Sequence, residues 1–385
     1  MEFLRFLESI RTPVGDALMS FITLFGEETL FIVLALVFFW CIDKRRGFYL
    51  LFTCFAGTIC IQVLKMIFRI PRPWVLDPNF TIVESAREAA TGYSFPSGHT
   101  QCAAGLWGGI ARSAKKRAVQ IGGTALVLLV GLSRMYLGVH TPLDVGVSLG
   151  IALVLILGLY YVVYLGFDKP NRIYIASGVL LIAAIANLLF VTLYQFPANV
   201  DPTNLANAQK TAWQMLALAI GVCLIYPLDR HWIKFETKAV WWAQLLKLAI
   251  GVGLVLAVRM GLKTPLNAIF GTNIGAGVRY FLIVVVAGIL WPMTFKFWSK
   301  LGENTRQKNS CPPDSQQNTL NGQNKTTIIV LCFLLGGWGV HNFMMGEKKK
   351  GILKIVLTFC FGIGCILALI DFVKLLTGEY VIETT

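Results

Sequence analysis

Residues 48–64 read FYLLFTCFAGTICIQVL, a run without a single charged side chain. About 17–25 apolar residues in a helix are enough to cross the hydrocarbon core of a bilayer. Basic residues stand at both ends of the run, with Lys44-Arg45-Arg46 before it and Lys65 after it. This stretch therefore predicts a transmembrane helix.

Apolar runs of this kind recur along the 385 residues. The chain is 56% hydrophobic and only 14% charged, with a mean hydropathy of +0.67, whereas soluble globular domains carry about 25% charged residues. The first run has no small-residue cleavage site behind a short apolar core, so it does not look like a removable signal peptide. We therefore predict an all-α integral membrane protein, with a helical-bundle core, additional transmembrane helices and a C-terminal two-helix hairpin.

The sequence divides into four parts. Residues 1–165 form the predicted core, which begins with an amphipathic helix at the membrane interface within residues 1–25. Residues 166–298 are predicted to be additional transmembrane helices, 299–325 a polar linker rich in helix breakers, and 326–378 a two-helix domain. Predicted spans lie near residues 30–42, 48–64, 98–111, 119–132, 143–165, 174–195, 212–228, 240–261, 279–298, 327–345 and 351–376, and the first of them has an alternative start at Ala17.

The formal net charge of +14 is distributed as in a membrane protein, and we expect no nucleic-acid partner. Basic residues cluster in short segments between apolar runs, which is typical of cytoplasmic loops. These segments are 44–46, 112–117, 169–172, 230–238 and 300–308. With the first two of them cytoplasmic, several span ends meet at the extracytoplasmic face of the cell membrane: those at Lys65, Ser97, Arg134 and His140.

The nine cysteines are too scattered for a disulfide framework. Most of them stand in apolar runs, where cysteine behaves as a small hydrophobic residue. The sequence contains no CxxC or Cys/His spacing of the kind that binds metals. We therefore expect neither a metal site nor a cofactor.

Three short motifs follow one another in the predicted core. Each of their residues has a plain structural interpretation when taken alone, as an interfacial anchor, a helix cap or a satisfied ion pair. Their joint occurrence in one order is improbable by chance, which favours a shared chemical role. The motifs are Lys65 with Arg72-Pro73, then Pro96-Ser97-Gly98-His99, then Ser133-Arg134 with His140 and Asp144.

Three cations, Lys65, Arg72 and Arg134, stand close to membrane depth, where an unpaired charge is costly. A phosphate dianion would offset that cost, and arginine grips phosphate oxygens with two hydrogen bonds. Lys65 and Arg72 are two helical turns apart and would share one face if the helix continued that far. The prolines on either side of Arg72 favour an earlier helix end, near Arg69.

Two helix starts are predicted to lie beside this anion. Ser97 stands as an N-cap before an apolar run, and Gly98 permits close approach to the free N–H groups of the helix start. His99 then lies in the first turn. In the last motif, Thr141-Pro142 is typical of a cap followed by proline, which puts His140 just before a helix and Asp144 in its first turn.

The two histidines have different surroundings. Asp144 can accept a hydrogen bond from one nitrogen of His140, which fixes the tautomer and leaves the other nitrogen free to attack phosphorus. Asp144 can also close a capping box with Thr141, and one carboxylate could do both. His99 has no carboxylate partner in sequence and suits the general acid that protonates the leaving oxygen.

These motifs resemble the signature of the type 2 phosphatidic acid phosphatase superfamily: lysine, six residues, arginine-proline; proline-serine-glycine-histidine; serine-arginine, five residues, histidine, three residues, aspartate. Every specified position matches, within roughly residues 1–165. The resemblance implies a metal-independent phosphatase. It also implies roles for each residue. His140 would be the nucleophile, Asp144 its orienting partner and His99 the acid, and the phosphate would be held by Lys65, Arg72, Ser97, Gly98 and Arg134.

The C-terminal part is similar to the two-transmembrane-helix domain that occurs beside diverse partners. The similarity lies in Gly336-Gly337-Trp338-Gly339-Val340-His341-Asn342-Phe343, several later glycines and Ile370-Asp371. Met344 replaces the family's usual aromatic residue, and Leu367-Ala368 replaces its usual tryptophan. The count of spans puts Lys348–Lys350 outside, against the positive-inside rule, so the topology of this hairpin stays open.

The sequence leaves the lipid substrate open. The outward site favours a lipid diphosphate carrier such as undecaprenyl diphosphate. A phospholipid monophosphatase acting on phosphatidic acid or phosphatidylglycerol phosphate is the alternative in the same class. A non-catalytic transporter or scaffold is a third hypothesis, although transporter sites usually lie at mid-bilayer in broken helices. Residues 74–95 are expected to cover the site and to tune substrate choice.

Overall fold

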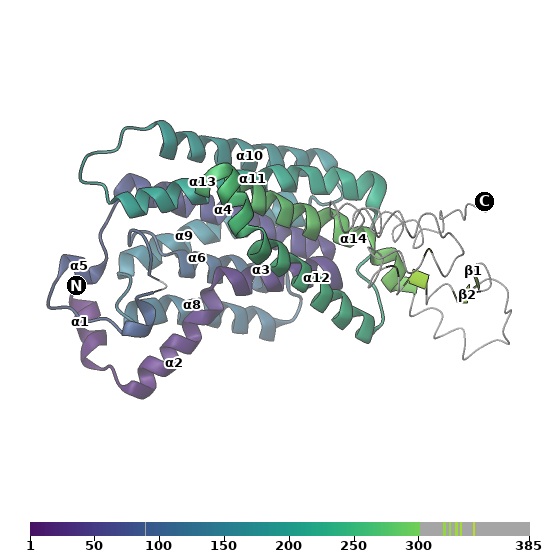
Figure 1. Ribbon diagram of the computed structural model, residues 1–385. Coiled ribbons are helices and arrows are strands. Elements are labelled where there is room, and N and C mark those ends of the chain that lie inside the picture. Colours follow the sequence, from purple (N-terminus) through teal and green to yellow (C-terminus); the bar gives the residue numbers. More distant parts are fainter. Residues whose placement is uncertain are drawn as a thin grey trace. The chain divides into compact units, whose positions relative to one another are not determined.

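The computed structural model describes residues 1–88 and 90–300, and beyond them positions 319, 320, 323, 324, 328, 329, 332 and 342 (Figure 1). Within these residues, seven helices are long and apolar enough to cross a membrane, or up to eight if one bent pair forms a single span. The prediction of an all-α multi-pass membrane protein is confirmed.

The N-terminal segment forms two helices, where the sequence indicated an amphipathic helix within residues 1–25. The helices are α1 (Glu2–Ser9) and α2 (Pro13–Thr23). Thr12 starts the second one, because its side chain accepts a hydrogen bond from the Gly15 amide at 3.1 Å and Pro13 follows it. A 3₁₀ turn, η1 (Leu24–Gly26), then leads into α3 (Glu28–Val37), which the π-turn η2 (Phe38–Ile42) extends. The helical segments Pro13–Gly26 and Glu28–Ile42 are bent by 50° relative to each other.

The helices that carry the three motifs follow. They are α4 (Lys44–Phe68), α5 (Pro73–Leu76), the 3₁₀ turn η3 (Glu84–Ala86), α6 (Gly98–Ala103), the π-turn η4 (Ala104–Gly108), α7 (Gly109–Ser113), α8 (Arg117–Tyr136), α9 (Pro142–Leu159) and the π-turn η5 (Tyr160–Tyr164). Helix α4 is central, since α3, α6 and α9 all pack against it. Its middle is lined with buried aromatic and aliphatic side chains such as Tyr49, Leu50 and Phe52.

The remaining helices are α10 (Pro170–Leu193), α11 (Pro202–Leu228), the π-turn η6 (Asp229–Ile233), α12 (Trp241–Gly261), α13 (Lys263–Val285), the π-turn η7 (Val286–Leu290) and α14 (Trp291–Met293). Helix α11 lies between α10 and α13 and packs against both (Figure 1). Gly271 interrupts α13 with a positive φ of 76°, a conformation that glycine adopts without strain.

The chain separates into two compact units, residues 1–237 with 248–289 and residues 238–247 with 290–385. In the second unit, the buried Lys247 ammonium lies 4.4 Å from the centre of the Phe295 ring. Two short strands, β1 (Thr319–Leu320) and β2 (Gln323–Asn324), pair antiparallel within the predicted linker. The rest of that linker after residue 300, and nearly all of the predicted two-helix domain, lie outside the described residues.

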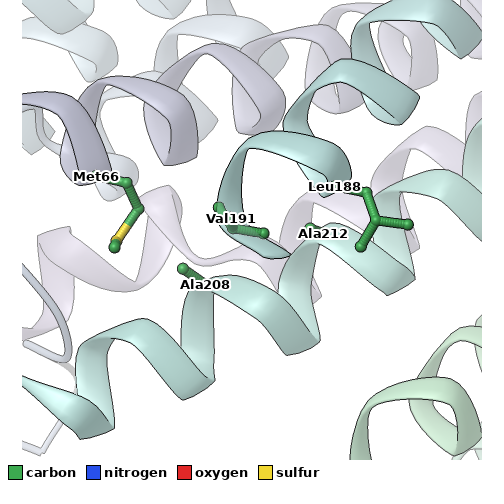
Figure 2. Packing of buried hydrophobic residues seen from close by; sticks show 5 residues of the cluster. All are labelled: Met66, Leu188, Val191, Ala208 and Ala212. Atoms are coloured by element: carbon green, nitrogen blue, oxygen red, sulfur yellow. The ribbon is translucent and has the colours of Figure 1, made fainter. Parts of the chain in front are cut away.

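A small apolar cluster packs the end of α4 against α10 and α11. Figure 2 shows Met66 of α4 beside Val191 of α10 and Ala208 of α11. Leu188 and Ala212 complete the buried part of the cluster. Because Met66 follows Lys65 directly, the cluster places α11 next to the first of the three motifs.

Candidate active site

A polar cavity of about 330 Å³ lies beside the C-terminal end of α4. Several of its lining residues come from the three motifs, although these are far apart in sequence: Lys65, Arg72, Gly98, His99, Arg134 and His140. The two other predicted site residues do not line it, but Asp144 contacts His140 and Ser97 caps the helix that carries His99. The structure thus brings the three motifs together around one small space.

Lys65 and Arg72 reach the cavity from different backbone segments. Helix α4 ends at Phe68, because Arg69 adopts a left-handed conformation with φ of 52°. Arg72 is extended and stands before Pro73, which begins α5. The two cations therefore do not share a helical face, and the early helix end that the prolines favour is the one observed. The Lys65 ammonium donates to the carbonyl of Tyr93.

Arg72 contributes a positive charge to the site and also connects its backbone segments by hydrogen bonds. Its guanidinium donates to the carbonyls of Thr91 at 2.7 Å, Gly92 at 3.0 Å and Val139 at 2.9 Å. Its Nη1 also lies 3.0 Å from Nε2 of His140. Arg72 therefore fixes the loop that closes one side of the cavity, within the segment 74–95 that the sequence predicted to cover the site.

Arg134 has more hydrogen-bond donors than the surrounding described residues use. It is 1% exposed, and its Nη1 donates to the Thr23 hydroxyl at 2.8 Å. Its Nε and Nη2 are buried and find no hydrogen-bond partner among the residues that the structure describes. An unsatisfied buried donor costs about 1–3 kcal/mol, and more when it is charged. This pair of nitrogens, which form one edge of the guanidinium, is suited to two oxygens of a bound phosphate.

The start of α6 faces the same space. Ser97 caps the helix, since its hydroxyl accepts from the Thr100 amide at 3.4 Å and the Thr100 hydroxyl at 2.9 Å. Nε2 of His99 is buried and, within the described residues, without a partner. Gln101 also lines the cavity, and both polar atoms of its buried amide are unpaired there. Sequence reasoning missed Gln101, whose only signal was a polar side chain in an apolar helix.

The surroundings of His140 determine its tautomer. A guanidinium can only donate, so the Nε2 that faces Arg72 Nη1 must be the unprotonated nitrogen. Nδ1 then carries the proton and faces Asp144 Oδ2 at 3.3 Å. The same oxygen accepts from the Thr141 amide at 2.8 Å and from the Ser94 hydroxyl at 2.5 Å. Asp144 thus serves the capping box and the imidazole together, and Ser94 is a partner that the motifs did not reveal.

Burial and nearby positive charge keep the His140 imidazole neutral. His140 lies in the connection between α8 and α9 and is 2% exposed. Its pKa is lowered well below the usual 6.5, first by the loss of solvent and then by Arg72, Arg134 and Lys65. The neutral form is the one in which the electron pair on Nε2 is not taken up by a proton.

Acidic residues and an apolar cavity complete the surroundings. Glu27 and Glu28, at the start of α3, line the polar cavity and were not singled out from the sequence. Thr29 lines both this cavity and a second one of about 100 Å³. The walls of the second cavity are almost wholly aliphatic and aromatic, from α3, α4, α11, α12 and α13. A polar site and an apolar pocket thus meet at Thr29.

Family models match three parts of the chain. Residues 46–167 match the PAP2 superfamily. Residues 213–304 match the transmembrane extension of PAP2 superfamily phosphatases, which gives a family relation to a region for which the motifs offered none. Residues 321–373 match the TM2 domain. No solved structure shows a significant match to the chain.

Three relatives illustrate these matches. The chain is 28% identical over 149 residues to undecaprenyl-diphosphatase BcrC of Bacillus subtilis, covering 38% of this chain and 74% of that protein. It is 26% identical over 215 residues to a probable sphingosine-1-phosphate phosphatase of Dictyostelium discoideum, covering 51% of this chain and half of that protein. The uncharacterized membrane protein YozV of B. subtilis is 42% identical over 58 residues, 15% of this chain and 71% of that protein.

The motifs, the cavity that they surround and the family matches agree. The membrane-spanning helices and the PAP2 transmembrane extension account for the apolar composition. The chain belongs to the PAP2 superfamily and is a multi-pass membrane phosphatase with a TM2 domain at its C-terminus.

Proposed function

We propose that this protein removes the terminal phosphate of a polyprenyl diphosphate such as undecaprenyl diphosphate. The reaction takes place at the extracytoplasmic face of the cell membrane, without a metal ion and through a phosphohistidine. The observation that carries the proposal is the pair of buried, unpaired donors of Arg134, in a cavity that also holds the unpaired Nε2 of His99 and Nε2 of His140. Such donors call for a ligand rich in acceptor oxygens, as phosphate is.

In the first step, Nε2 of His140 attacks the terminal phosphorus. The N–P bond forms while the bond from phosphorus to the bridging oxygen breaks, and the lipid monophosphate leaves with that oxygen. Arg134, Arg72 and Lys65 stabilise the charge on the transferring phosphoryl group. Asp144 holds the imidazole in its reactive tautomer and stabilises the positive charge that develops on it. His99 donates a proton to the leaving oxygen where the leaving group requires one.

In the second step, His99 acts as a base. It takes a proton from water, whose oxygen attacks the phosphorus of phosphohistidine. The N–P bond breaks, inorganic phosphate forms, and His140 returns to its neutral state. Where His99 has protonated the leaving oxygen, the same group thus serves as acid and then as base. Where the leaving phosphate takes no proton, the proton drawn from water passes from His99 to the released phosphate or to solvent.

Two observations support a lipid as the substrate. The polar cavity shares Thr29 with the apolar cavity, so a molecule with a phosphate at one end and a hydrocarbon chain at the other matches both. The two named phosphatase relatives are described as acting on undecaprenyl diphosphate and on sphingosine 1-phosphate, both lipids. Because these relatives differ in substrate, a lipid monophosphatase is the second candidate.

The orientation rests on the basic residues. Helix α4 runs from Lys44 to Phe68, a rise of about 37 Å at 1.5 Å per residue, which exceeds the hydrocarbon thickness of a bilayer. Its first turn carries the basic cluster, and its last turn carries Lys65 at the cavity. Cytoplasmic placement of the basic end puts the cavity at the opposite face.

Phosphate release from a panel of lipids tests the function. The purified chain in detergent or vesicles is given undecaprenyl diphosphate, phosphatidic acid, phosphatidylglycerol phosphate and sphingosine 1-phosphate. We expect release from undecaprenyl diphosphate, no effect of EDTA, and inhibition by vanadate, which mimics the five-coordinate phosphorus. Loss of release in EDTA would disprove the metal-independent reaction, and preference for a single-phosphate lipid would favour the second candidate.

The lowered pKa of His140 predicts the acid limb of the pH profile. The nucleophile must be neutral, so protonation of His140 should not lower kcat/KM, which reports the free enzyme and free substrate, as the pH falls past 6.5, and should do so only below the lowered pKa. Replacing Lys65 with glutamine removes one of the cations that lower this pKa. The acid limb of the Lys65→Gln variant should therefore move to higher pH, measured with the same substrate so that its own ionisation is unchanged. A limb that stays in place, or moves to lower pH, contradicts the assignment.

A further inference from the structure

A second polar cavity, of about 300 Å³, adjoins the candidate active site. The two cavities share three wall residues, Gln62, Lys65 and Thr91. The other wall of this second polar cavity is formed by α11, which lies outside the part of the chain that carries the three motifs. We call this space the α11 cavity.

The wall contributed by α11 is a polar stripe on a membrane helix. Asn204, Asn207, Thr211 and Gln214 recur at intervals of three and four residues, so they share one helical face. Lys210 lies on the same stripe and also lines the cavity. Polar and charged side chains within membrane helices are costly, and they usually mark a substrate path or a wet cavity.

The position of α11 relative to the active site is fixed by several contacts. The Met66 cluster packs α4 against α10 and α11 (Figure 2). Asp201 caps α11 by accepting from the Thr203 amide at 2.8 Å, and its own amide donates to the Tyr93 hydroxyl at 3.3 Å. The carbonyl of the same Tyr93 accepts from Lys65. The start of α11 is thereby joined through one residue to a cation of the active site.

Lys210 carries a charge that meets no counter-charge within the described part of the chain. It is half-buried, and none of the residues that the structure describes forms an ion pair or a hydrogen bond with it. Its neighbours on the stripe are neutral amides and a hydroxyl. A cation in this setting favours an anionic ligand, and the adjoining cavity is the one that would hold the scissile phosphate.

We propose that the α11 cavity binds the phosphate end of the leaving group and that Lys210 contacts this second phosphate of the substrate, the one that stays with the lipid after hydrolysis. This inference rests on the proposed function. It assigns to the enzyme a substrate class with two phosphate groups, either a polyprenyl diphosphate or a phospholipid with a terminal phosphate and an internal phosphodiester. Lipids with one phosphate place nothing anionic beside Lys210.

The test compares substrates with one and two phosphates in the full chain. Lys210→Met should lower kcat/KM for undecaprenyl diphosphate or for phosphatidylglycerol phosphate by about tenfold to a hundredfold, as expected for a lost charge-assisted hydrogen bond. The same variant should change kcat/KM for phosphatidic acid by less than about twofold. Which of the two-phosphate lipids responds identifies the source of the second phosphate. Lys210→Arg keeps the charge and should recover most of the loss.

A matched control removes the same charge elsewhere. Lys263 stands exposed at the start of α13 and lines neither cavity, so Lys263→Met should leave both substrate classes unchanged. Equal losses of Lys210→Met on one-phosphate and two-phosphate lipids would show a structural role and overturn the inference, as would no loss on any lipid. A wild-type enzyme that cleaves only phosphatidic acid would overturn it while leaving a lipid phosphatase in place. Absence of release from every lipid would instead refute the proposed function.

Discussion

Replacing His140 with asparagine is expected to reduce phosphate release from every lipid substrate by a factor on the order of 10⁴ or more, the usual cost of losing a nucleophile. The reason is geometric, because the side chain of His140 presents the unprotonated nitrogen that Arg72 and Asp144 orient. Asparagine is polar, similar in size and able to donate to Asp144, so the variant removes the attacking nitrogen with little change in packing.

The measurement has two parts and one control. Phosphate release is followed at saturating substrate, and the denatured enzyme is examined for phosphate that is labile to acid and stable to base, as phosphohistidine is. Both signals should be lost in His140→Asn. His231→Asn, which changes an exposed histidine in η6 away from the cavity, should retain both. A His140→Asn enzyme that keeps more than a few per cent of the wild-type rate would eliminate His140 as the nucleophile.

Most of the fold follows from the apolar runs. The run at residues 48–64 lies inside α4, and the runs near 119–132 and 143–165 correspond to α8 and to α9 with η5. These segments were predictable because the bilayer sets a minimum length and excludes unpaired backbone groups, so length and hydropathy suffice. The break at Thr12 was not foreseen, since a single cap with a following proline competes with a longer amphipathic pattern.

The motif residues were predictable, but their partners were not. Nothing in sequence joins Ser94 to Asp144, or Thr23 to Arg134, because such pairs depend on how distant segments pack. The hydrogen bonds from Arg72 to the carbonyls of Thr91 and Gly92 could not be predicted either, since every residue carries a carbonyl. The sequence therefore predicts which side chains gather in the cavity, whereas the structure reveals which of them remain free for a ligand.

The polar stripe of α11 is a second feature whose role could not be predicted from the sequence alone. Asn204, Asn207 and Gln214 could be seen in the sequence as polar residues at helical spacing. Their meaning depends on what lies opposite, and that is Lys65 and the loop around Thr91. The family match to residues 213–304 includes only Gln214 of this stripe, and the cavity is recognised from the packing of α11 on α4.

The second large predicted effect is the loss of kcat/KM when His99 is replaced, and its size depends on the leaving group. A phosphate monoester of an aliphatic alcohol expels an alkoxide, which requires a proton, whereas a diphosphate expels a phosphate, which is already a good leaving group. We therefore expect His99→Asn to lower kcat/KM for phosphatidic acid by about 10²–10⁴-fold, the usual contribution of a general acid. The loss on undecaprenyl diphosphate should be at least about tenfold smaller.

The choice of kcat/KM is essential to this comparison. His99 is also the base that activates water in the second step, and that step is the same for every substrate. Because kcat/KM covers events only up to the first irreversible step, the departure of the lipid, it isolates the proton transfer to the leaving oxygen. A comparison of kcat alone would combine both roles and would hide the difference if hydrolysis of phosphohistidine limited turnover.

An aryl phosphate provides the internal control. Its leaving phenolate is stable without protonation, so His99→Asn should lower kcat/KM for p-nitrophenyl phosphate much less than for phosphatidic acid, although both are monoesters. Sensitivity that follows the basicity of the leaving group identifies a general acid. Equal losses on the three substrates would mean instead that His99 holds the phosphate, as its unpaired Nε2 would also permit.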